Sequence, residues 1–121
     1  MKPRRLISSG SVWESRVGYS RAVRVGEHVW VSGTVGDGGD AYEQTKTAIA
    51  KIEVALHEAG AALDDVVRTR IFVRNIGDWE SVARAHLEAF RDVRPAATMV
   101  EVSRLIADEY LVEVEVDAYV G

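Results

Sequence analysis

Three histidines are the side chains of this 121-residue sequence best suited to exchanging protons near neutral pH. They are His28, His57 and His86, and their wide separation lacks the spacing of a metal-binding set, so no metal ion is expected. His86 shares one stripe of a helical pattern with Val82 and Phe90. It could therefore serve as an acid or a base, or it could be a packed histidine whose hydrogen bonds are satisfied. His28 and His57 are expected to be structural or exposed.

Other kinds of reactive site lack the residues that they would need. The sequence contains no cysteine, which removes disulfides, thiolate nucleophiles and zinc–thiolate sites together. The glycine-rich segment 36–40 lacks the lysine and the following helix pattern of a phosphate-binding loop, so we interpret it as a plain loop.

Hydrophobic periodicity predicts one α+β domain with the element order β-β-α-β-α-β-β. The turn signal Gly26-Glu27 separates the first two strands, which should form a hairpin. Both helices are expected to lie on one face of a mixed sheet. The strands are predicted at 22–25, 28–35, 66–73, 97–102 and 111–119, and the helices at 42–59 and 79–90.

Alternation along two of these strands indicates which side chains face the helices. In strand 111–119, valines alternate with the acidic residues Glu113, Glu115 and Asp117. In strand 66–73, two arginines alternate with a set that is expected to be buried, namely Val67, Thr69, Ile71 and Val73. If the apolar sets lie under the helices, the opposite face carries a row of carboxylates and a row of guanidiniums.

Two interpretations fit this charged face. It could be a solvated sheet surface whose ion pairs are each worth less than about 1 kcal/mol. However, His28, Trp30 and Phe72 fall on the same face, and aromatic residues among paired charges suit a surface covered by another copy of the chain. The pattern therefore favours an oligomer of undetermined order.

The overall composition limits the classes of partner. With 15 Lys and Arg against 19 Asp and Glu, the net charge is −4, so neither nucleic acid nor a membrane is an expected partner. The length fits a single domain, 1–121, with 1–12 as an N-terminal extension whose Lys2, Arg4 and Arg5 are expected to be solvated. No apolar run could span a bilayer and no signal-peptide pattern is present, so a cytoplasmic location is expected.

Several segments in the same order and spacing resemble one known family over nearly the whole chain after about Trp13. They are Gly18–Gly26, Val29–Gly33, Gln44-Thr45, Ala59–Val67 and Arg94–Val102. Together they are similar to the Rid family of reactive intermediate deaminases, also called YjgF-like proteins. The resemblance is specific for family and fold, and much less so for activity.

The resemblance implies a chorismate-mutase-like, or YjgF-like, α+β fold and a homotrimer with small-molecule clefts between its subunits. In such trimers the sheets pack inward and the helices outward, which agrees with the charged face predicted above. Family members with deaminase activity hydrolyse enamines and imines, such as 2-aminoacrylate, to 2-oxo acids and ammonia, and they use no metal or organic cofactor.

The resemblance also assigns site residues. The cleft tyrosine of the family falls on Tyr19, and its Ser-Gly strand end falls on Ser32 and Gly33. The glutamate that holds or activates the attacking water falls on Glu113. A buried glutamate that is paired across the sheet with an arginine of strand 66–73 would look the same in sequence, so this role and a structural one both remain open.

Three positions depart from the deaminating members. Their closing motif reads Pro-Ala-Arg-Ser-Cys-Val-Glu-Val, whereas residues 95–102 read Pro-Ala-Ala-Thr-Met-Val-Glu-Val. The arginine that pairs with the substrate carboxylate is therefore Ala97, the cleft cysteine is Met99, and an asparagine of the second helix is Ala83. Loss of a buried charge partner costs on the order of 3–5 kcal/mol, so the chain falls in a subgroup expected to prefer a less acidic ligand there. Arg21 could replace the missing arginine, or it could be solvated.

Three functions therefore stand as hypotheses. The first is water addition to a C=N bond, with Glu113 as the catalytic residue and Tyr19, Ser32, Gly33, Arg21, His86, Ala97 and Met99 around the substrate. The second is a non-catalytic trimer that binds a small ligand. The third is the endoribonuclease or translation-inhibitor role of some relatives, which the acidic charge disfavours.

Overall fold

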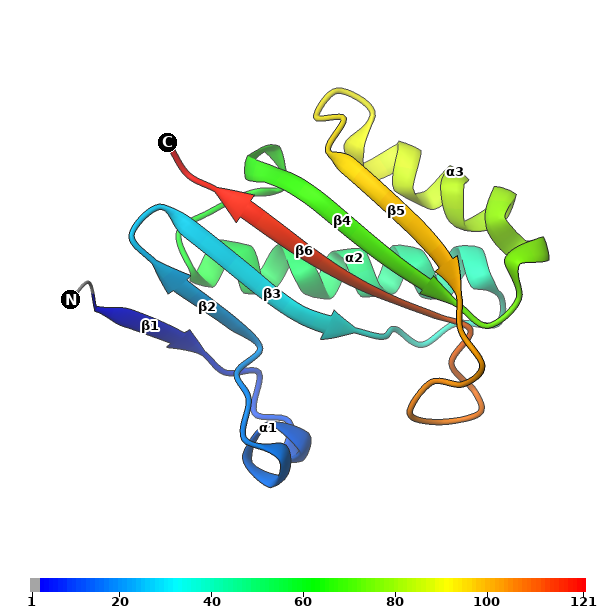
Figure 1. Cartoon of the computed structure of the whole chain (residues 1–121), viewed down its shortest axis with the longest axis horizontal. Coiled ribbons are helices and arrows are strands. Elements are labelled where there is room, and N and C mark those ends of the chain that lie inside the picture. The colour runs from blue at the N-terminus through cyan, green and yellow to red at the C-terminus, as the bar shows by residue number, and fades with distance from the viewer. Residues whose placement is uncertain (1–2) are drawn as a thin grey trace.

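The computed structural model describes residues 3–121 and is built on a six-stranded sheet (Figure 1). The strands are β1 (Arg4–Ile7), β2 (Ala22–Val25), β3 (His28–Thr34), β4 (Val66–Val73), β5 (Ala96–Glu101) and β6 (Val112–Tyr119). Their order across the sheet is β1-β2-β3-β6-β4-β5. Only β4 and β5 are parallel neighbours, and the other paired strands run antiparallel, so the predicted mixed sheet is confirmed.

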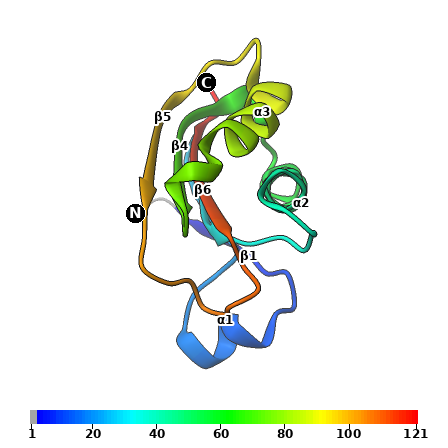
Figure 2. The ribbon, with the colours of Figure 1, turned by 90° about the vertical axis from the view of Figure 1, so that its right-hand side faces the viewer.

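The two main helices, α2 (Ala41–Glu58) and α3 (Trp79–Phe90), cover the same face of the sheet, as predicted (Figure 2). Short 3₁₀ turns, η1 (Leu63–Asp65) and η2 (Ile76–Asp78), precede β4 and α3. α2 begins where the Asp40 side chain accepts a hydrogen bond of 2.8 Å from the Glu43 amide. No helix within residues 3–121 is long and apolar enough to cross a membrane.

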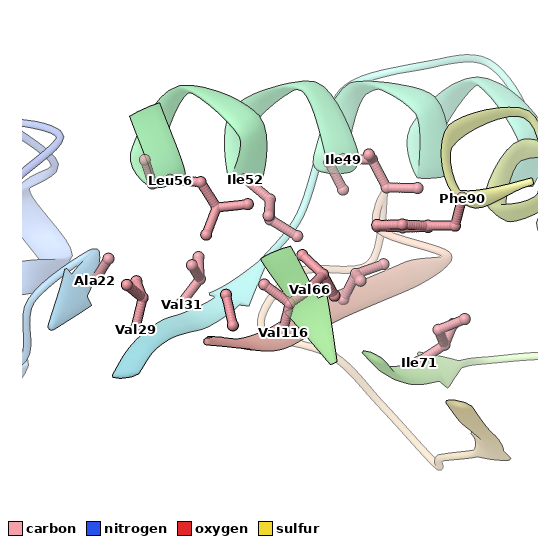
Figure 3. Close-up of a cluster of buried hydrophobic side chains, with 14 of the residues drawn as sticks. Ala22, Val29, Val31, Ile49, Ile52, Leu56, Val66, Ile71, Phe90 and Val116 are labelled. Atoms are coloured by element: carbon pink, nitrogen blue, oxygen red, sulfur yellow. The ribbon is translucent and has the colours of Figure 1, made fainter. Parts of the chain in front are cut away.

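The hydrophobic core lies between these helices and the sheet. Figure 3 shows Ile52 and Leu56 of α2 pointing toward Val29 and Val31 of β3 and Val116 of β6. All five side chains are almost fully buried. Burial of each such aliphatic side chain contributes about 1.5–3 kcal/mol, so this seam holds α2 against the centre of the sheet.

The opposite face of the sheet is charged, as the alternation predicts. The valines of β6 are buried and its carboxylates are half-buried on the other side. Arg70 of β4 lies across from them, with Nη1 3.2 Å from Asp117 Oδ2 and 3.6 Å from Glu115 Oε2. These partly exposed ion pairs are each worth less than about 1 kcal/mol.

Aromatic residues share this charged face, as predicted. Trp30 pairs with Asp117, and Phe72 pairs with Glu113. The rings of His28 and Trp30 are stacked with their centroids 5.5 Å apart. A second copy that covers this face stays a prediction.

Val67 was placed on the wrong face by the alternation. It is 52% exposed, whereas the preceding Val66 is buried. The reason is a register shift between Val66 and Arg68, where β4 has one more residue than its partner β6. Such a bulge reverses the alternation locally, and nothing in the pattern of strand 66–73 reveals it.

The N-terminal segment was expected to be a solvated tail, but where the structure describes it the segment is a strand, although Arg4 and Arg5 are exposed as expected. Lys2 lies outside the described residues. Arg4 and Arg5 belong to β1, which pairs with β2, and a short helix α1 (Val12–Val17) follows (Figure 1). Arg5 Nη2 donates a hydrogen bond of 2.8 Å to the carbonyl oxygen of Glu58 at the end of α2. That carbonyl group has no partner within its helix, so the arginine supplies one.

Candidate functional site

A groove opens between α1, α2, the end of β3 and the loop 102–111 that joins β5 to β6. Its volume is about 850 Å³, within the range of small-molecule sites. We call it the α1 groove. Four of the predicted site residues line it, namely Tyr19, Arg21, Gly33 and Glu113.

Glu113 reaches the α1 groove because β3 carries a bulge. The register between β3 and β6 shifts by one residue between the pairs Val31–Val116 and Thr34–Val114. Gly33 lies in this irregular stretch, directly against the Glu113 side chain. A Cβ atom added to Gly33 would lie 3.0 Å from Glu113 Cδ and still nearer to Oε2. Only glycine therefore leaves room for the carboxyl group in this position.

The environment of Glu113 disfavours its ionised form. Burial raises the pKa of the Glu113 carboxyl group above its ordinary value, and nearby Glu115 adds to this, while the positive charge of Arg21 opposes it. Glu113 forms no ion pair with Arg68 or Arg70, because Arg70 pairs with the other two acidic residues of β6. The cross-strand ion pair that sequence alone left open for Glu113 is therefore absent from the described residues. A carboxyl group held in this way is suited to accept a proton from water.

Arg21 is half-buried beside this carboxyl group rather than solvated. Its Nη2 donates a hydrogen bond of 2.8 Å to the carbonyl oxygen of Gly33. Its Nε is buried and has no partner among residues 3–121. Its Cζ lies 5.7 Å from the centre of the Tyr19 ring. Within the described residues no ion pair of 4.0 Å or less joins Arg21 to Glu113, so the guanidinium keeps capacity for an acceptor from a ligand.

Ser32 is close to this group, but its hydroxyl is occupied. Ser32 Oγ donates a hydrogen bond of 2.7 Å to the carbonyl oxygen of Ser20. The side chain lines a second pocket of about 770 Å³, together with Ser20 and Tyr19. Ser32 therefore fixes the loop that carries Tyr19.

The remaining predicted residues, Ala97, Met99 and His86, line a different hollow of about 580 Å³ between α3 and β5. We call it the α3–β5 hollow, and Ala83 also lines it. β5 is two strands away from β6 in the sheet, with β4 between them. One chain therefore places Ala97, Met99 and His86 in an opening separate from the α1 groove.

His86 is packed in the α3–β5 hollow with a hydrogen-bond partner. Its Nε2 lies 2.9 Å from Thr69 Oγ1, and its ring centroid lies 4.8 Å from that of Phe90. Burial lowers the pKa of His86, so the ring is neutral near pH 7. These contacts fit the interpretation of His86 as a satisfied structural histidine.

Several groove residues were not found by sequence reasoning, among them Trp13, Tyr110 and Ile106. The first of these had a usable signal. Ser11-Val-Trp-Glu14 matches a helix-start pattern, and Ser11 Oγ accepts a hydrogen bond of 3.3 Å from the Trp13 amide. Tyr110 and Ile106 had no such signal in the sequence, because only the fold brings loop 102–111 beside α1. No group of three or more His, Asp or Glu able to hold a metal ion occurs within residues 3–121.

Comparison with known proteins gives a family match over residues 11–120, to the model described as endoribonuclease L-PSP. An uncharacterized protein of Streptomyces coelicolor is 43% identical over 124 residues, which cover 97% of this chain and 92% of the relative. A 2-iminobutanoate/2-iminopropanoate deaminase of Dermatophagoides farinae is 30% identical over 113 residues, which cover 87% of this chain and 88% of the relative.

A solved structure is also very similar. It is the crystal structure of a member of the highly conserved YjgF/YER057c/UK114 family from Mycobacterium tuberculosis. It has a TM-score of 0.96 and 55% sequence identity, and the match covers 98% of this chain and 100% of that one. At this likeness the two chains share the same fold.

Proposed function

The chain belongs to the YjgF/Rid family, whose model is described as endoribonuclease L-PSP, and from this we propose that it hydrolyses an enamine or imine to a carbonyl compound and ammonia. The observation that carries the proposal is the half-buried Glu113 carboxyl group held against Gly33 in the α1 groove. A relative named as an imine deaminase supports the same reaction class.

The reaction needs one base that can give the proton back. Glu113 takes a proton from water as the water oxygen bonds to the carbon of C=N, and the nitrogen is protonated to give a carbinolamine. The hydroxyl proton of the carbinolamine then passes by way of Glu113 to the amine nitrogen, and the C–N bond breaks as C=O forms and ammonia leaves. One water is consumed, one ammonia is released, and no electron donor or acceptor is required. The raised pKa of Glu113 brings its basicity closer to neutral pH, which favours both proton transfers.

A second copy of the chain would complete the site. The resemblance assigns Glu113, Ala97 and Met99 to one cleft, yet in a single chain the first lies in the α1 groove and the other two in the α3–β5 hollow. We propose that the α3–β5 hollow of one subunit closes the α1 groove of the next in a homotrimer. The charged and aromatic face of the sheet would then be covered within the trimer.

The test is ammonia and 2-oxo acid release from enzymatically generated amino-acid imines, including 2-aminoacrylate, above the spontaneous rate. Glu113→Gln should lower turnover about 10²–10⁴-fold, which is the usual contribution of a general base. Glu115→Gln, two positions along the same strand and outside the α1 groove, should stay close to the wild type. Ala97→Arg restores the arginine of the deaminating members and should raise activity toward 2-aminoacrylate.

Each other function predicts a different result. A non-catalytic binding protein would be stabilised by a ligand in proportion to its concentration but would turn over no imine. An activity gained only in Ala97→Arg would mean that the scaffold is intact and that its natural ligand is of another kind. Cleavage of single-stranded RNA that Glu113→Gln leaves intact would support the endoribonuclease role, against the net charge of −4.

A further inference from the structure

Large apolar side chains gather around the α1 groove from three separate parts of the chain. Trp13 and Val17 of α1 are 45% and 68% exposed, Val54 of α2 is 58% exposed and Ile106 of the loop 102–111 is 69% exposed. We call this set the apolar wall. Exposed apolar groups grouped around one opening mark a binding surface.

The part of the apolar wall on α1 is held in a fixed place. A six-residue helix is too short to be stable alone. The buried Glu14 carboxylate anchors it by accepting hydrogen bonds from Ser8 Oγ at 2.9 Å and from the Ser9 amide and hydroxyl groups. Gly18, with φ of 92°, then ends the helix and leads into Tyr19. Trp13 and Val17 are therefore presented to the groove by an anchored element.

The more buried part of the groove is polar and carries a positive charge. Arg21 still has hydrogen-bonding capacity there, since within residues 3–121 its guanidinium donates a hydrogen bond from Nη2 to the Gly33 carbonyl oxygen and does not pair directly with Glu113. A guanidinium binds a carboxylate through two parallel hydrogen bonds, and it does so most strongly where water is excluded. Two cationic side chains line the groove, Arg21 and Lys51, and the Lys51 ammonium donates a hydrogen bond of 2.9 Å to the carbonyl oxygen of Val35. Arg21 is the one that lies next to the proposed base, so it is the expected partner of an anionic group of a ligand.

We propose that the α1 groove selects imines of bulky, apolar 2-amino acids, with the carboxylate on Arg21, the C=N carbon near Glu113 and the side chain along the apolar wall. This inference rests on the proposed function and names its substrate class. The volume of about 850 Å³ suits such a molecule, whereas the methyl-sized side chain of an alanine-derived imine leaves the apolar wall uncovered. Arg21 thus supplies the charge that Ala97 lacks.

The first experiment compares kcat/KM for imines made from alanine, leucine and phenylalanine. Each methylene that a pocket recognises is worth about 10–200-fold, so the two larger imines should exceed the alanine imine by at least about 10-fold. Val17→Thr should reduce this preference several-fold. Val12→Thr is the matched control, because Val12 lies on the same helix, is 65% exposed and does not line the groove. Arg21→Met should raise KM for all three imines alike, and Arg21→Lys should recover part of the loss.

A second measurement does not depend on turnover. Calorimetric titration with the stable products pyruvate, 4-methyl-2-oxopentanoate and phenylpyruvate should show tighter binding of the two larger acids, and Arg21→Met should weaken all of them. Light scattering of Val17→Thr should show an unchanged oligomer.

The outcomes separate the two proposals. Preferential binding of the larger 2-oxo acids without turnover of any imine would refute the catalytic function and leave the ligand class standing. Equal turnover of all three imines, with no effect of Val17→Thr, would overturn the ligand class and leave the function standing. Dissociation of the oligomer by Val17→Thr would also overturn it, because the apolar wall would then be covered by a second copy.

Discussion

Replacing Gly33 by alanine tests whether the Glu113 carboxyl group lies where the structure puts it. The new Cβ would meet Glu113 Cδ at 3.0 Å and Cγ at 3.5 Å, whereas ordinary van der Waals contact begins at 3.4 Å. The carboxyl group must therefore move. Gly33 does not have the positive φ that favours glycine, so the backbone itself accepts alanine without strain.

The expected magnitudes differ for stability and for activity. The atoms that must move are the end of a flexible side chain, so overpacking should cost about 1 kcal/mol. Alanine also lowers the conformational entropy of the unfolded chain, which stabilises the folded state by about 0.4–1 kcal/mol. The two effects nearly cancel, so the melting temperature should stay within about 4 °C of the wild type. A catalytic group displaced by about 1 Å commonly loses about 100-fold in rate, and imine hydrolysis should fall by that factor.

The assay combines imine turnover with thermal unfolding and with carboxyl NMR titration of Glu113. Two other glycines bracket the result. Gly39→Ala meets no atom within 4 Å and should leave turnover and the Glu113 pKa unchanged, while Gly36→Ala places its Cβ 2.6 Å from the backbone nitrogen of Ala48 and should strongly destabilise the fold. If Gly33→Ala keeps wild-type turnover and an unchanged Glu113 pKa, the position assigned to the carboxyl group is refuted.

Three further predictions concern charged groups. Burial raises the pKa of Glu113, while the positive charge of Arg21 opposes this rise. Arg21→Met should therefore move the acidic limb of the pH profile of kcat/KM to higher pH. A limb that stays in place or moves to lower pH would contradict this prediction. Burial lowers the pKa of His86, so the native state binds that proton more weakly than the unfolded chain does. Thermal unfolding should therefore show stability falling as the pH drops below about 6.5, and His86→Gln should flatten this fall. Burial alone would raise the pKa of Glu14, but hydrogen bonds from Ser9 and Ser8 lower it. The stabilisation by Glu14 is therefore present above about pH 4.3 and lost below. Glu14→Gln should cost about 1–2 kcal/mol at pH 7 and speed amide exchange in residues 12–17, and exchange equal to that of the wild type would show that Glu14 does not anchor α1.

The candidate site was only partly predictable from the sequence. The resemblance named Tyr19, Gly33 and Glu113, and Arg21 was a candidate replacement for the missing arginine. The fold brings these four into one groove. Whether Arg21 is solvated could not be known, because its burial depends on α1 and β3, which come from different parts of the chain. The sequence pattern likewise could not show that one chain holds Ala97, Met99 and His86 in a separate hollow.

The sequence by itself determined the features that depend on residues close together in the chain. The period of two in β6 predicted which side is buried, and the helical period and Gly60 predicted α2 to within one residue at each end. These predictions succeed because a strand or a long helix must turn its apolar side chains to one face to bury them.

Only the tertiary structure decided the features whose stability comes from distant contacts. β1 and α1 are too short to be stable alone, and they form because β2 pairs with the first and the buried Glu14 anchors the second. The bulge at Gly33 exists because β3 must pair with β6, which lies far away in the sequence. That pairing places Gly33 against the Glu113 carboxyl group, beside Arg21. The local pattern carries no information about it, because the energy that holds the bulge comes from the partner strand.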